Sequence, residues 1–101
     1  MELEFDANKD RENIKNHGVS LSLAHEFVWE KAFVWPDTRF GYDELRMNAL
    51  VPVRGKLYHA TFVERGVKTR IISIRKASRR ENRNYERNYY NQLWACSDSS
   101  H

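Results

Sequence analysis

Two short glycine-containing turns separate three strand-like stretches: apolar and polar residues alternate at 45–53, aromatic and β-branched residues are frequent at 57–63, and the last stretch runs over 67–75. A period of two places apolar side chains on one face of a strand, and turns as short as those around Gly55 and Gly66 join antiparallel neighbours. We therefore expect a three-stranded antiparallel meander. This pattern constrains the fold more than any other feature, because it fixes which strands pair.

The run at 32–35 predicts a fourth strand, because aromatic and β-branched residues follow one another and Pro36 and Gly41 end the run. In the last strand, strict alternation places two sets of side chains on opposite faces. One set is Lys68, Arg70, Ile72, Ile74 and Lys76, and the other is Thr69, Ile71, Ser73 and Arg75. Because isoleucines occur in both sets, both faces of this strand need cover, as in the middle of a sheet.

Helix signals precede the predicted sheet. Asp6 is a suitable N-cap for a first helix at about 7–16, and Gly18 suits the left-handed position that follows a helix. Ser20 is a suitable cap for a second helix at about 21–31. The apolar residues of that helix recur at helical spacing as Leu21, Ala24, Phe27 and Val28.

A third helix is predicted after Ser78. Ser78 and Glu81 have the spacing of a capping box, in which each side chain bonds the backbone N–H of the other residue. Tyr85, Tyr89 and Leu93 then follow at steps of four and form a narrow stripe suited to packing on the sheet. The order of helices, sheet and helix predicts an α+β domain with two N-terminal helices, an antiparallel sheet of about four strands and a C-terminal helix.

Length and composition limit the remaining possibilities. The 101 residues suffice for one small domain, which we place at 4–94, followed by a polar tail at 95–101 that we expect to fray. A hydrophobic content of 41% is too high for a disordered chain, and no apolar run approaches the ~20 residues of a membrane span. Cys96 is the only cysteine and the first residues lack an apolar signal segment, so we expect a cytoplasmic protein without an internal disulfide.

Positive charge is concentrated in the second half of the chain, although the net charge is only +3. The segment 65–87 holds nine lysine and arginine residues against Glu81 and Glu86. Such a segment attracts polyanions, so its partner is either a nucleic acid or an acidic protein surface. The alternative is a solvated helix face beside a basic strand, which needs no partner. The candidates for RNA binding are Arg65, Lys68, Arg79, Arg80 and Arg83.

Three groups of residues form a further pattern. The first is Glu4-Phe5-Asp6, Asn13, His17-Gly18-Val19-Ser20 and Ala24, the second is Glu44-x-Arg46-x-x-Ala49, and the third is Arg70-Ile71-Ile72-Ser73-x-Arg75-Lys76-Ala77-Ser78-x-x-Glu81 with Tyr85 and Glu86. Together these groups resemble the BrnT family of bacterial toxins. They keep the family's order and spacing over about 4–90. The resemblance implies a RelE-like fold, a ribonuclease activity that slows growth, and neutralisation by a ribbon-helix-helix antitoxin (BrnA-like) that also binds operator DNA. The chain departs from the family pattern at Asn16 and Asp43.

Cleavage of RNA without a metal requires that the 2′-OH lose its proton, that the phosphate be held, that the transition-state charge be stabilised and that the leaving 5′-oxygen be protonated. Guanidinium groups bind phosphate oxygens through two parallel hydrogen bonds, but a pKa above ~12 makes them poor proton donors. We expect Arg75 and Arg70 to clamp the phosphate, with Lys76 and Arg46 in support. The alternative for each is a surface charge or a salt bridge.

His17 is the best candidate for proton transfer, because imidazole titrates near ~6.5. Its alternative role is to cap the helix that ends before Gly18. Glu44 either serves as a base or orients Arg46, whereas His59, on an apolar strand, is expected in the core or in an interface. The chain has no C-x-x-C pair and no H-E-x-x-H motif, and we expect neither a metal nor a cofactor.

Two hypotheses follow from these observations. The first is a metal-independent endoribonuclease toxin that acts on single-stranded RNA, assembles with a ribbon-helix-helix antitoxin and contacts operator DNA only through that antitoxin. The second is a non-catalytic nucleic-acid-binding or adaptor module that uses 65–87 as a basic surface. The first cleaves RNA in the presence of EDTA, whereas the second binds RNA and leaves it intact.

Overall fold

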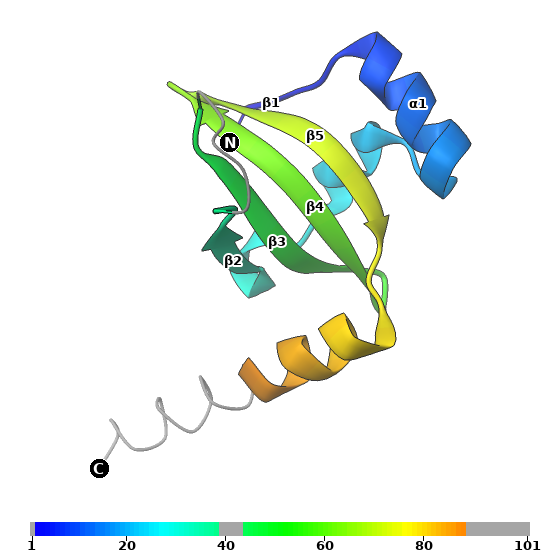
Figure 1. The fold of residues 1–101 in the computed structure, drawn as a ribbon, viewed down its shortest axis with the longest axis vertical. Coiled ribbons are helices and arrows are strands. Elements are labelled where there is room, and N and C mark those ends of the chain that lie inside the picture. Colours follow the sequence, from blue (N-terminus) through cyan, green and yellow to red (C-terminus); the bar gives the residue numbers. More distant parts are fainter. Residues whose placement is uncertain (1, 39–43, 89–101) are drawn as a thin grey trace.

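A five-stranded sheet forms the centre of the computed structural model, which describes residues 2–38 and 44–88 (Figure 1). The strands are β1 (Glu2–Glu4), β2 (Phe33–Pro36), β3 (Arg46–Val53), β4 (Lys56–Arg65) and β5 (Lys68–Lys76). Their order in the sheet is β1-β5-β4-β3-β2. Strands β2 to β5 pair antiparallel in succession, so the predicted meander and its fourth strand are confirmed.

Strand β1 is not predicted by the alternation pattern. It lies parallel to β5, with Leu3 opposite Thr69 and Glu4 opposite Arg70. The expected antiparallel sheet of about four strands is therefore wrong in this respect, because the sheet has five strands and is mixed. Three residues are too few to reveal a period of two, and the pairing of β1 depends on a strand that is distant in the sequence.

Helix α1 (Ala7–His17) occupies the predicted segment. It ends at Gly18, whose φ of 70° is a left-handed conformation that glycine adopts without strain. The N–H of Gly18 donates to the carbonyl of Ile14 at 2.8 Å. Asp6 stands at the N-cap position, but its side chain makes no capping hydrogen bond, contrary to expectation.

The predicted helix at 21–31 is wrong, because two short 3₁₀ helices, η1 (Leu21–Glu26) and η2 (Trp29–Lys31), replace it. Between them, the N–H of Val28 donates to the carbonyl of Pro52 in β3 at 3.2 Å. This hydrogen bond to the sheet takes the place of a hydrogen bond within a helix. The contact with β3 therefore overrides the local preference of residues 21–31 for a helix. The buried residues of the predicted stripe are Leu21, Ala24 and Phe27.

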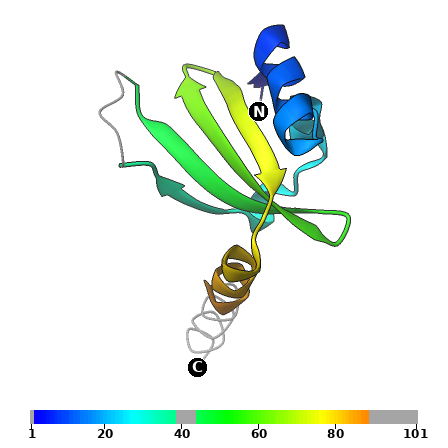
Figure 2. The same cartoon turned by 45° about the vertical axis from the view of Figure 1, so that its right-hand side comes forward.

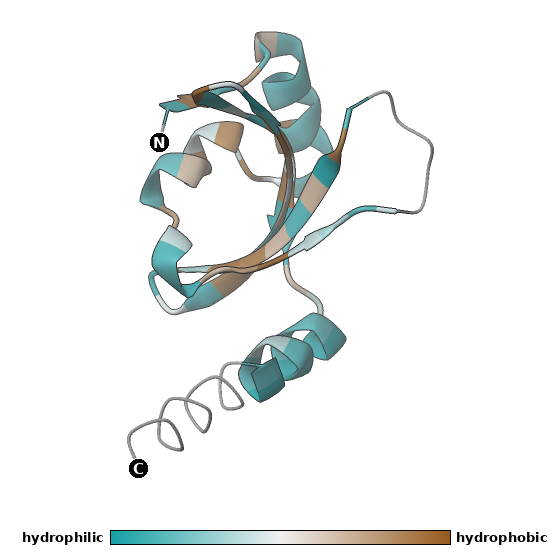
Figure 3. Ribbon diagram, turned by 90° about the vertical axis from the view of Figure 1, so that its left-hand side faces the viewer, coloured by the Kyte–Doolittle hydropathy of each residue, from teal (hydrophilic) through white to brown (hydrophobic). Residues whose placement is uncertain are grey.

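The core lies between the sheet and the two 3₁₀ helices, which sit inside the curve of the sheet (Figure 3). Trp29 of η2 contacts Phe27 and Phe62 edge to face, with ring centroids 5.3 and 5.5 Å apart. The buried core residues are Leu21, Ala24, Phe27, Ala49, Val51, Val53, Ala60, Phe62, Ile71 and Ile74. We call the face of the sheet that is turned away from η1 and η2 the open face.

A β-bulge in β5 changes the alternation of its side chains. Thr61 of β4 lies opposite Ser73, but the next residue, Phe62, lies opposite Ile71. Ile72 is therefore an extra residue on the bulged strand. Such an insertion is invisible in an alternation pattern that contains Ile71 and Ile72 side by side.

The bulge places two isoleucines on one face and two arginines on the other. Ile71 and Ile74 both point into the core and are 0% exposed. Arg70 and Arg75 both line hollows on the open face. The expectation that strict alternation separates Arg70 from Arg75 is therefore wrong, because the extra residue restores both to the same side.

Helix α1 closes the edge of β5 that β1 leaves uncovered (Figure 2). The buried side chain of Asn13 makes both hydrogen bonds that a neighbouring strand would make. Its Nδ2 donates to the carbonyl of Ile74 at 2.8 Å and its Oδ1 accepts from the N–H of Ile74 at 3.1 Å. Nδ2 also donates to the carbonyl of Val19 at 2.7 Å. Asn13 therefore satisfies backbone groups that an open sheet edge would leave unpaired.

A helix over 79–88 follows β5, and its predicted capping box is confirmed (Figure 1). The N–H of Ser78 donates to Oε1 of Glu81 at 2.8 Å, and the N–H of Glu81 donates to Oγ of Ser78 at 3.1 Å. The hydroxyl of Tyr85 donates to the carbonyl of Lys31 at 2.6 Å, which connects this helix to η2.

Some predictions concern residues beyond 88. The stripe residues Tyr89 and Leu93, together with the tail at 95–101, lie outside the described residues. Within 2–38 and 44–88, no helix is both long enough and apolar enough to cross a membrane.

We predict that Asn13→Ala lowers the free energy of unfolding by about 2–4 kcal/mol, because it leaves the buried N–H and C=O of Ile74 without their partner. Urea denaturation followed by circular dichroism measures this change. Asn8→Ala is the matched control, since Asn8 is exposed on the same helix, and it should change stability by no more than about 0.5 kcal/mol. Equal losses in the two variants would contradict the edge-closing role of Asn13.

Candidate active site on the open face of the sheet

Three rows of side chains cross the strands on the open face. Residues directly opposite each other on paired strands point to the same side, so the register of the sheet identifies each row. The first row is Arg46, Val63, Arg70 and Glu4, the middle row is Trp35, Asn48, Thr61 and Ser73, and the third row is Phe33, Leu50, His59 and Arg75. Two of the hollows along these rows contain most of the expected site residues.

The histidine hollow covers the middle and third rows. It is lined by His17, Trp35, Asn48, His59, Thr61, Ser73, Arg75 and Glu81. His17 comes from the last turn of α1, whereas His59 and Arg75 lie opposite each other on β4 and β5. The buried ring of His59 contacts the ring of Trp35, with centroids 5.9 Å apart. Two imidazoles suited to proton transfer therefore share a hollow with a guanidinium suited to phosphate.

Arg75 and Glu81 form a two-pronged ion pair in this hollow. Nη1 and Nη2 of Arg75 donate to the two carboxylate oxygens of Glu81 at 2.7 and 2.9 Å. This pairing, helped by the backbone N–H of Ser78 and by the charge of His59, lowers the pKa of Glu81 from 4.5 to about 2. Glu81 is therefore ionised at neutral pH, where it positions Arg75 and has no proton to donate.

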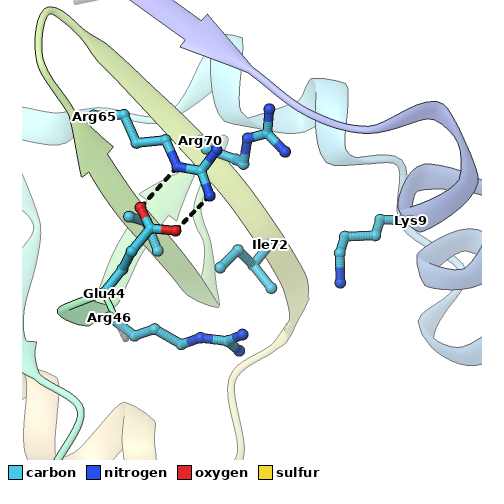
Figure 4. A pocket seen from close by; sticks show the side chains of 7 residues that line it. Lys9, Glu44, Arg46, Arg65, Arg70 and Ile72 are labelled. Atoms are coloured by element: carbon cyan, nitrogen blue, oxygen red, sulfur yellow. Dashed lines mark hydrogen bonds and ion pairs between the residues drawn. The ribbon is translucent and has the colours of Figure 1, made fainter. Parts of the chain in front are cut away.

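The cationic hollow lies at the other end of the open face and includes part of the first row (Figure 4). Its lining residues are Lys9, Glu44, Arg46, Val63, Arg65, Arg70 and Ile72. Four of these side chains are cations and one is a carboxylate. The cations come from α1, β3, β4 and β5, so the hollow exists only in the folded chain.

Glu44 is held by Arg65. Both carboxylate oxygens accept hydrogen bonds from that guanidinium, one of them from Nε at 2.8 Å. The pKa of Glu44 is lowered, first by this hydrogen bond and then by the nearby charges of Arg65, Arg70 and Arg46. These hydrogen bonds of Glu44 come from Arg65, and the charge of Arg46, the partner expected from the sequence, also lowers the pKa of Glu44.

The structure assigns the two arginines of the expected clamp to different hollows. Arg70 lines the cationic hollow, where its Nε donates to Glu4 at 3.2 Å, and Arg75 lines the histidine hollow. Their rows are separated by the middle row, which corresponds to roughly 13 Å along a strand. The expectation of one clamp formed by both is corrected to two neighbouring cationic positions on one face.

One comparison with known proteins bears on this geometry. The family model described as "Ribonuclease toxin, BrnT, of type II toxin-antitoxin system" matches residues 5–81. The chain belongs to the BrnT family. No curated protein matches the chain. All residues that line the two hollows fall within the matched BrnT segment, whereas most of the helix over 79–88 lies beyond it.

Lys76 takes no part in either hollow of this BrnT chain. It lies opposite Tyr58, which packs against the core, so Lys76 is on the other face of β5 from Arg75. The expected support of Arg75 by Lys76 is not matched by this geometry. The reason is again the alternation of the strand, which directs neighbouring residues to opposite sides.

The residues expected to bind RNA are distributed over two regions. Arg65 lines the cationic hollow, and Lys68 is exposed at the start of β5, with its Nζ 4.0 Å from Glu4. Arg79, Arg80 and Arg83 are exposed on the helix that follows β5. The basic segment 65–87 therefore contributes cations both to the cationic hollow and to the surface of the helix that follows β5.

The apolar neighbours of His59 on β4 predict a position in the core or in an interface. His59 is buried, but it lies outside the core cluster, on the open face beside Thr61 and opposite Arg75. Alternation along β4 contains the signal, since His59 shares a side with Thr61 and not with the core residues Ala60 and Phe62.

The described residues do not form a cluster of metal ligands. Within 2–38 and 44–88, no three His, Cys, Asp or Glu side chains come together in a group that could hold a metal ion. The side chains that the histidine hollow itself offers for proton transfer are its two imidazoles, and its guanidinium is suited to stabilising negative charge.

We predict that the side-chain carboxyl of Glu81 titrates near pH 2 in an NMR titration, and that Arg75→Ala raises its pKa toward 4.5. Because the folded pKa lies below the unfolded one, the stability contributed by this pair is complete above about pH 4.5 and is lost as the pH falls toward 2. Arg79→Ala removes the same charge from an exposed position on the next helix and should leave the titration unchanged. A Glu81 that titrates normally in the wild type would contradict the pairing.

Proposed function

We propose that this BrnT family member is a metal-independent endoribonuclease that cleaves single-stranded RNA in the cytoplasm and thereby inhibits growth. One observation carries the proposal: His17, His59 and Arg75 line the same hollow on the open face. These are the side-chain types that metal-free cleavage of a phosphodiester needs, namely two groups that exchange protons near neutral pH and one that holds the phosphate.

The arrangement supports a division of roles between the two histidines. His17 is exposed at the end of α1 and, as a neutral imidazole, would accept the proton of the attacking 2′-OH. His59 is buried in the same hollow as the ionised Glu81, opposite Arg75. We assign His59 to protonation of the leaving 5′-oxygen, because a carboxylate nearby favours an imidazole that carries a proton.

Arg75 is assigned to the charge that develops on the phosphate. Its guanidinium is fixed by Glu81, and its side chain is still 40% exposed toward the hollow and solvent. A group that is already oriented loses little entropy when it meets the transition state. Glu81 acts on the reaction through Arg75 and is therefore a positioning residue.

Membership of a type II toxin-antitoxin family implies a cognate antitoxin. We propose that this antitoxin is of the ribbon-helix-helix type, that it forms a hetero-oligomer with the toxin, and that it alone contacts operator DNA. An acidic or apolar segment of the antitoxin that folds over the basic end of β5 would neutralise the toxin, because it would cover the cations that attract RNA.

A second candidate function has one observation in its favour. Arg70 and Arg75 are each hydrogen-bonded to a carboxylate, as expected of cations with structural roles. In that case the chain is a non-catalytic nucleic-acid-binding or adaptor module, and it would bind RNA with a steep salt dependence while leaving the RNA intact.

We predict that the purified protein degrades single-stranded RNA in EDTA, and that Arg75→Ala reduces the rate about 10²–10³-fold because a transition-state charge donor is lost. Product formation from a labelled oligonucleotide measures the rate. Arg54→Ala is the matched control, since Arg54 is an exposed arginine paired with Glu26 at the β3–β4 turn, and its rate should stay within about twofold of the wild type. RNA that stays intact with the wild-type protein would contradict the nuclease and favour the binding module.

We predict a bell-shaped dependence of kcat/KM on pH, because one imidazole must be neutral and the other charged. His17→Ala should abolish the acidic limb and His59→Ala the alkaline limb, each with a large loss of rate. The profile is measured over about pH 5–9, a range in which Glu81 stays ionised because its pKa is about 2. An unchanged profile in both variants would contradict the assigned proton transfers.

A further inference from the structure

We propose that the cationic hollow is a second phosphate site, which binds a phosphodiester flanking the one that is cleaved. This inference rests on the proposed function, because it takes the histidine hollow as the place of cleavage. The RNA strand then runs along the open face from Lys9 to Arg75. The shortest RNA that the protein binds well therefore has more than one phosphodiester.

The charge of the hollow favours an anion. Among the described residues, Lys9, Arg46, Arg65 and Arg70 line the hollow with one carboxylate, that of Glu44, and Arg70 also bonds Glu4, so these four cations outnumber the two carboxylates. The pKa of Glu44 is lowered by three different arginines, which indicates that their fields overlap at one point. An anion that enters the hollow experiences the same fields.

The geometry suits a phosphate group. Arg46 and Arg70 lie in one cross-strand row on either side of Val63, which places their Cα atoms roughly 10 Å apart. Two arginine side chains can reach one phosphate between them at that separation, and each guanidinium presents a planar pair of N–H donors. Figure 4 shows Ile72 between the side chains of Arg46 and Lys9, all three of which line the hollow.

Helix α1 provides an independent measure of how the two hollows are spaced. Lys9, Asn13 and His17 follow at steps of four and lie on one face of the helix. Lys9 lines the cationic hollow, Asn13 is fixed to Ile74 of β5, and His17 lines the histidine hollow. Eight residues of helix correspond to about 12 Å, in agreement with the roughly 13 Å between the row of Arg70 and the row of Arg75.

The middle row between the two cationic positions is uncharged. It presents the amide of Asn48 and the hydroxyls of Thr61 and Ser73, and Oγ1 of Thr61 donates to Oδ1 of Asn48 at 3.2 Å. The nucleosides between the two phosphates carry ribose hydroxyls and polar base edges, which such groups can bind. Trp35, at the end of this row, offers a ring for stacking.

The cationic hollow contributes binding and not proton transfer. Its cations are lysine and arginine, and the pKa of Glu44 is lowered, so none of these groups exchanges protons readily near neutral pH. Loss of a cation from this hollow should therefore raise KM more than it lowers kcat. An acidic peptide is the competing ligand class, and the fork-shaped arginines and the position on the same face of the sheet as the histidine hollow favour RNA over it.

Binding is tested with 2′-O-methyl RNA, which cannot be cleaved because the attacking hydroxyl is blocked. We expect Arg46→Ala and Lys9→Ala each to weaken binding of a hexanucleotide about tenfold and to reduce the slope of log K against log salt by about 0.7. A dinucleotide, which has one phosphodiester, should bind weakly and with nearly equal affinity to wild type and variants. Fluorescence anisotropy measures both ligands.

The matched controls remove the same charges from outside the hollow. Lys15→Ala is on the same helix as Lys9, and Arg54→Ala is at the end of the strand that begins with Arg46. Neither residue lines a hollow of the open face, and neither variant should change the affinity by more than about twofold. Equal effects of the hollow and control variants would overturn the proposal, because they would indicate only a diffuse attraction.

Two further outcomes separate this proposal from the proposed function. The expected binding pattern in a protein that never cleaves RNA would support the phosphate site and contradict the nuclease. Cleavage without any effect of Arg46→Ala or Lys9→Ala on hexanucleotide binding would support the nuclease and overturn the phosphate site. Tighter binding of a polyglutamate peptide than of the hexanucleotide, lost in the same variants, would also overturn it.

Discussion

The extra residue at Ile72 is the constraint on which the candidate site depends. Uninterrupted alternation would direct Arg75 into the core and Ile74 to the open face. Burial of a guanidinium in an apolar core is costly, and exposure of an isoleucine forfeits about 1.5–3 kcal/mol of hydrophobic stabilisation. The bulge avoids both costs with one residue, since it leaves Ile71 and Ile74 fully buried and places Arg70 and Arg75 together on the open face.

One contact, between Asn13 and Ile74, both closes the sheet edge and positions side chains of the candidate site. Asn13 bonds both backbone groups of Ile74, two residues beyond the bulge, and this contact fixes the height of α1 along β5. Lys9 and His17 lie one turn to either side of Asn13 on the same face of the helix, so each is set beside one hollow. A buried amide that satisfies the backbone thus also determines which functional side chains reach the open face.

Elements with local signals could be predicted from the sequence, and elements that depend on distant partners could not. The meander, the segment of α1 and the capping box follow from spacing within a few residues. By contrast, the bond from Val28 to Pro52 breaks the expected second helix, and the bulge at Ile72 depends on the register with β4. The residues of the candidate site could be predicted only in part for the same reason. Residue type was enough to select Arg75 as a candidate, whereas the apolar neighbours of His59 favoured a place in the core or in an interface.

Pairing with a carboxylate does not remove an arginine from phosphate binding. A guanidinium has five N–H donors, and Glu81 engages Nη1 and Nη2 of Arg75 while that side chain stays 40% exposed. Because Glu81 already orients Arg75, this long side chain would lose less conformational entropy on binding RNA. The carboxylate also neutralises part of the positive charge of Arg75. Since the pKa of Glu81 is about 2, this orientation is constant wherever the protein is folded near neutral pH. The proposed mechanism therefore assigns proton transfer to the imidazoles and phosphate binding to the arginines, so that different side chains perform the two tasks.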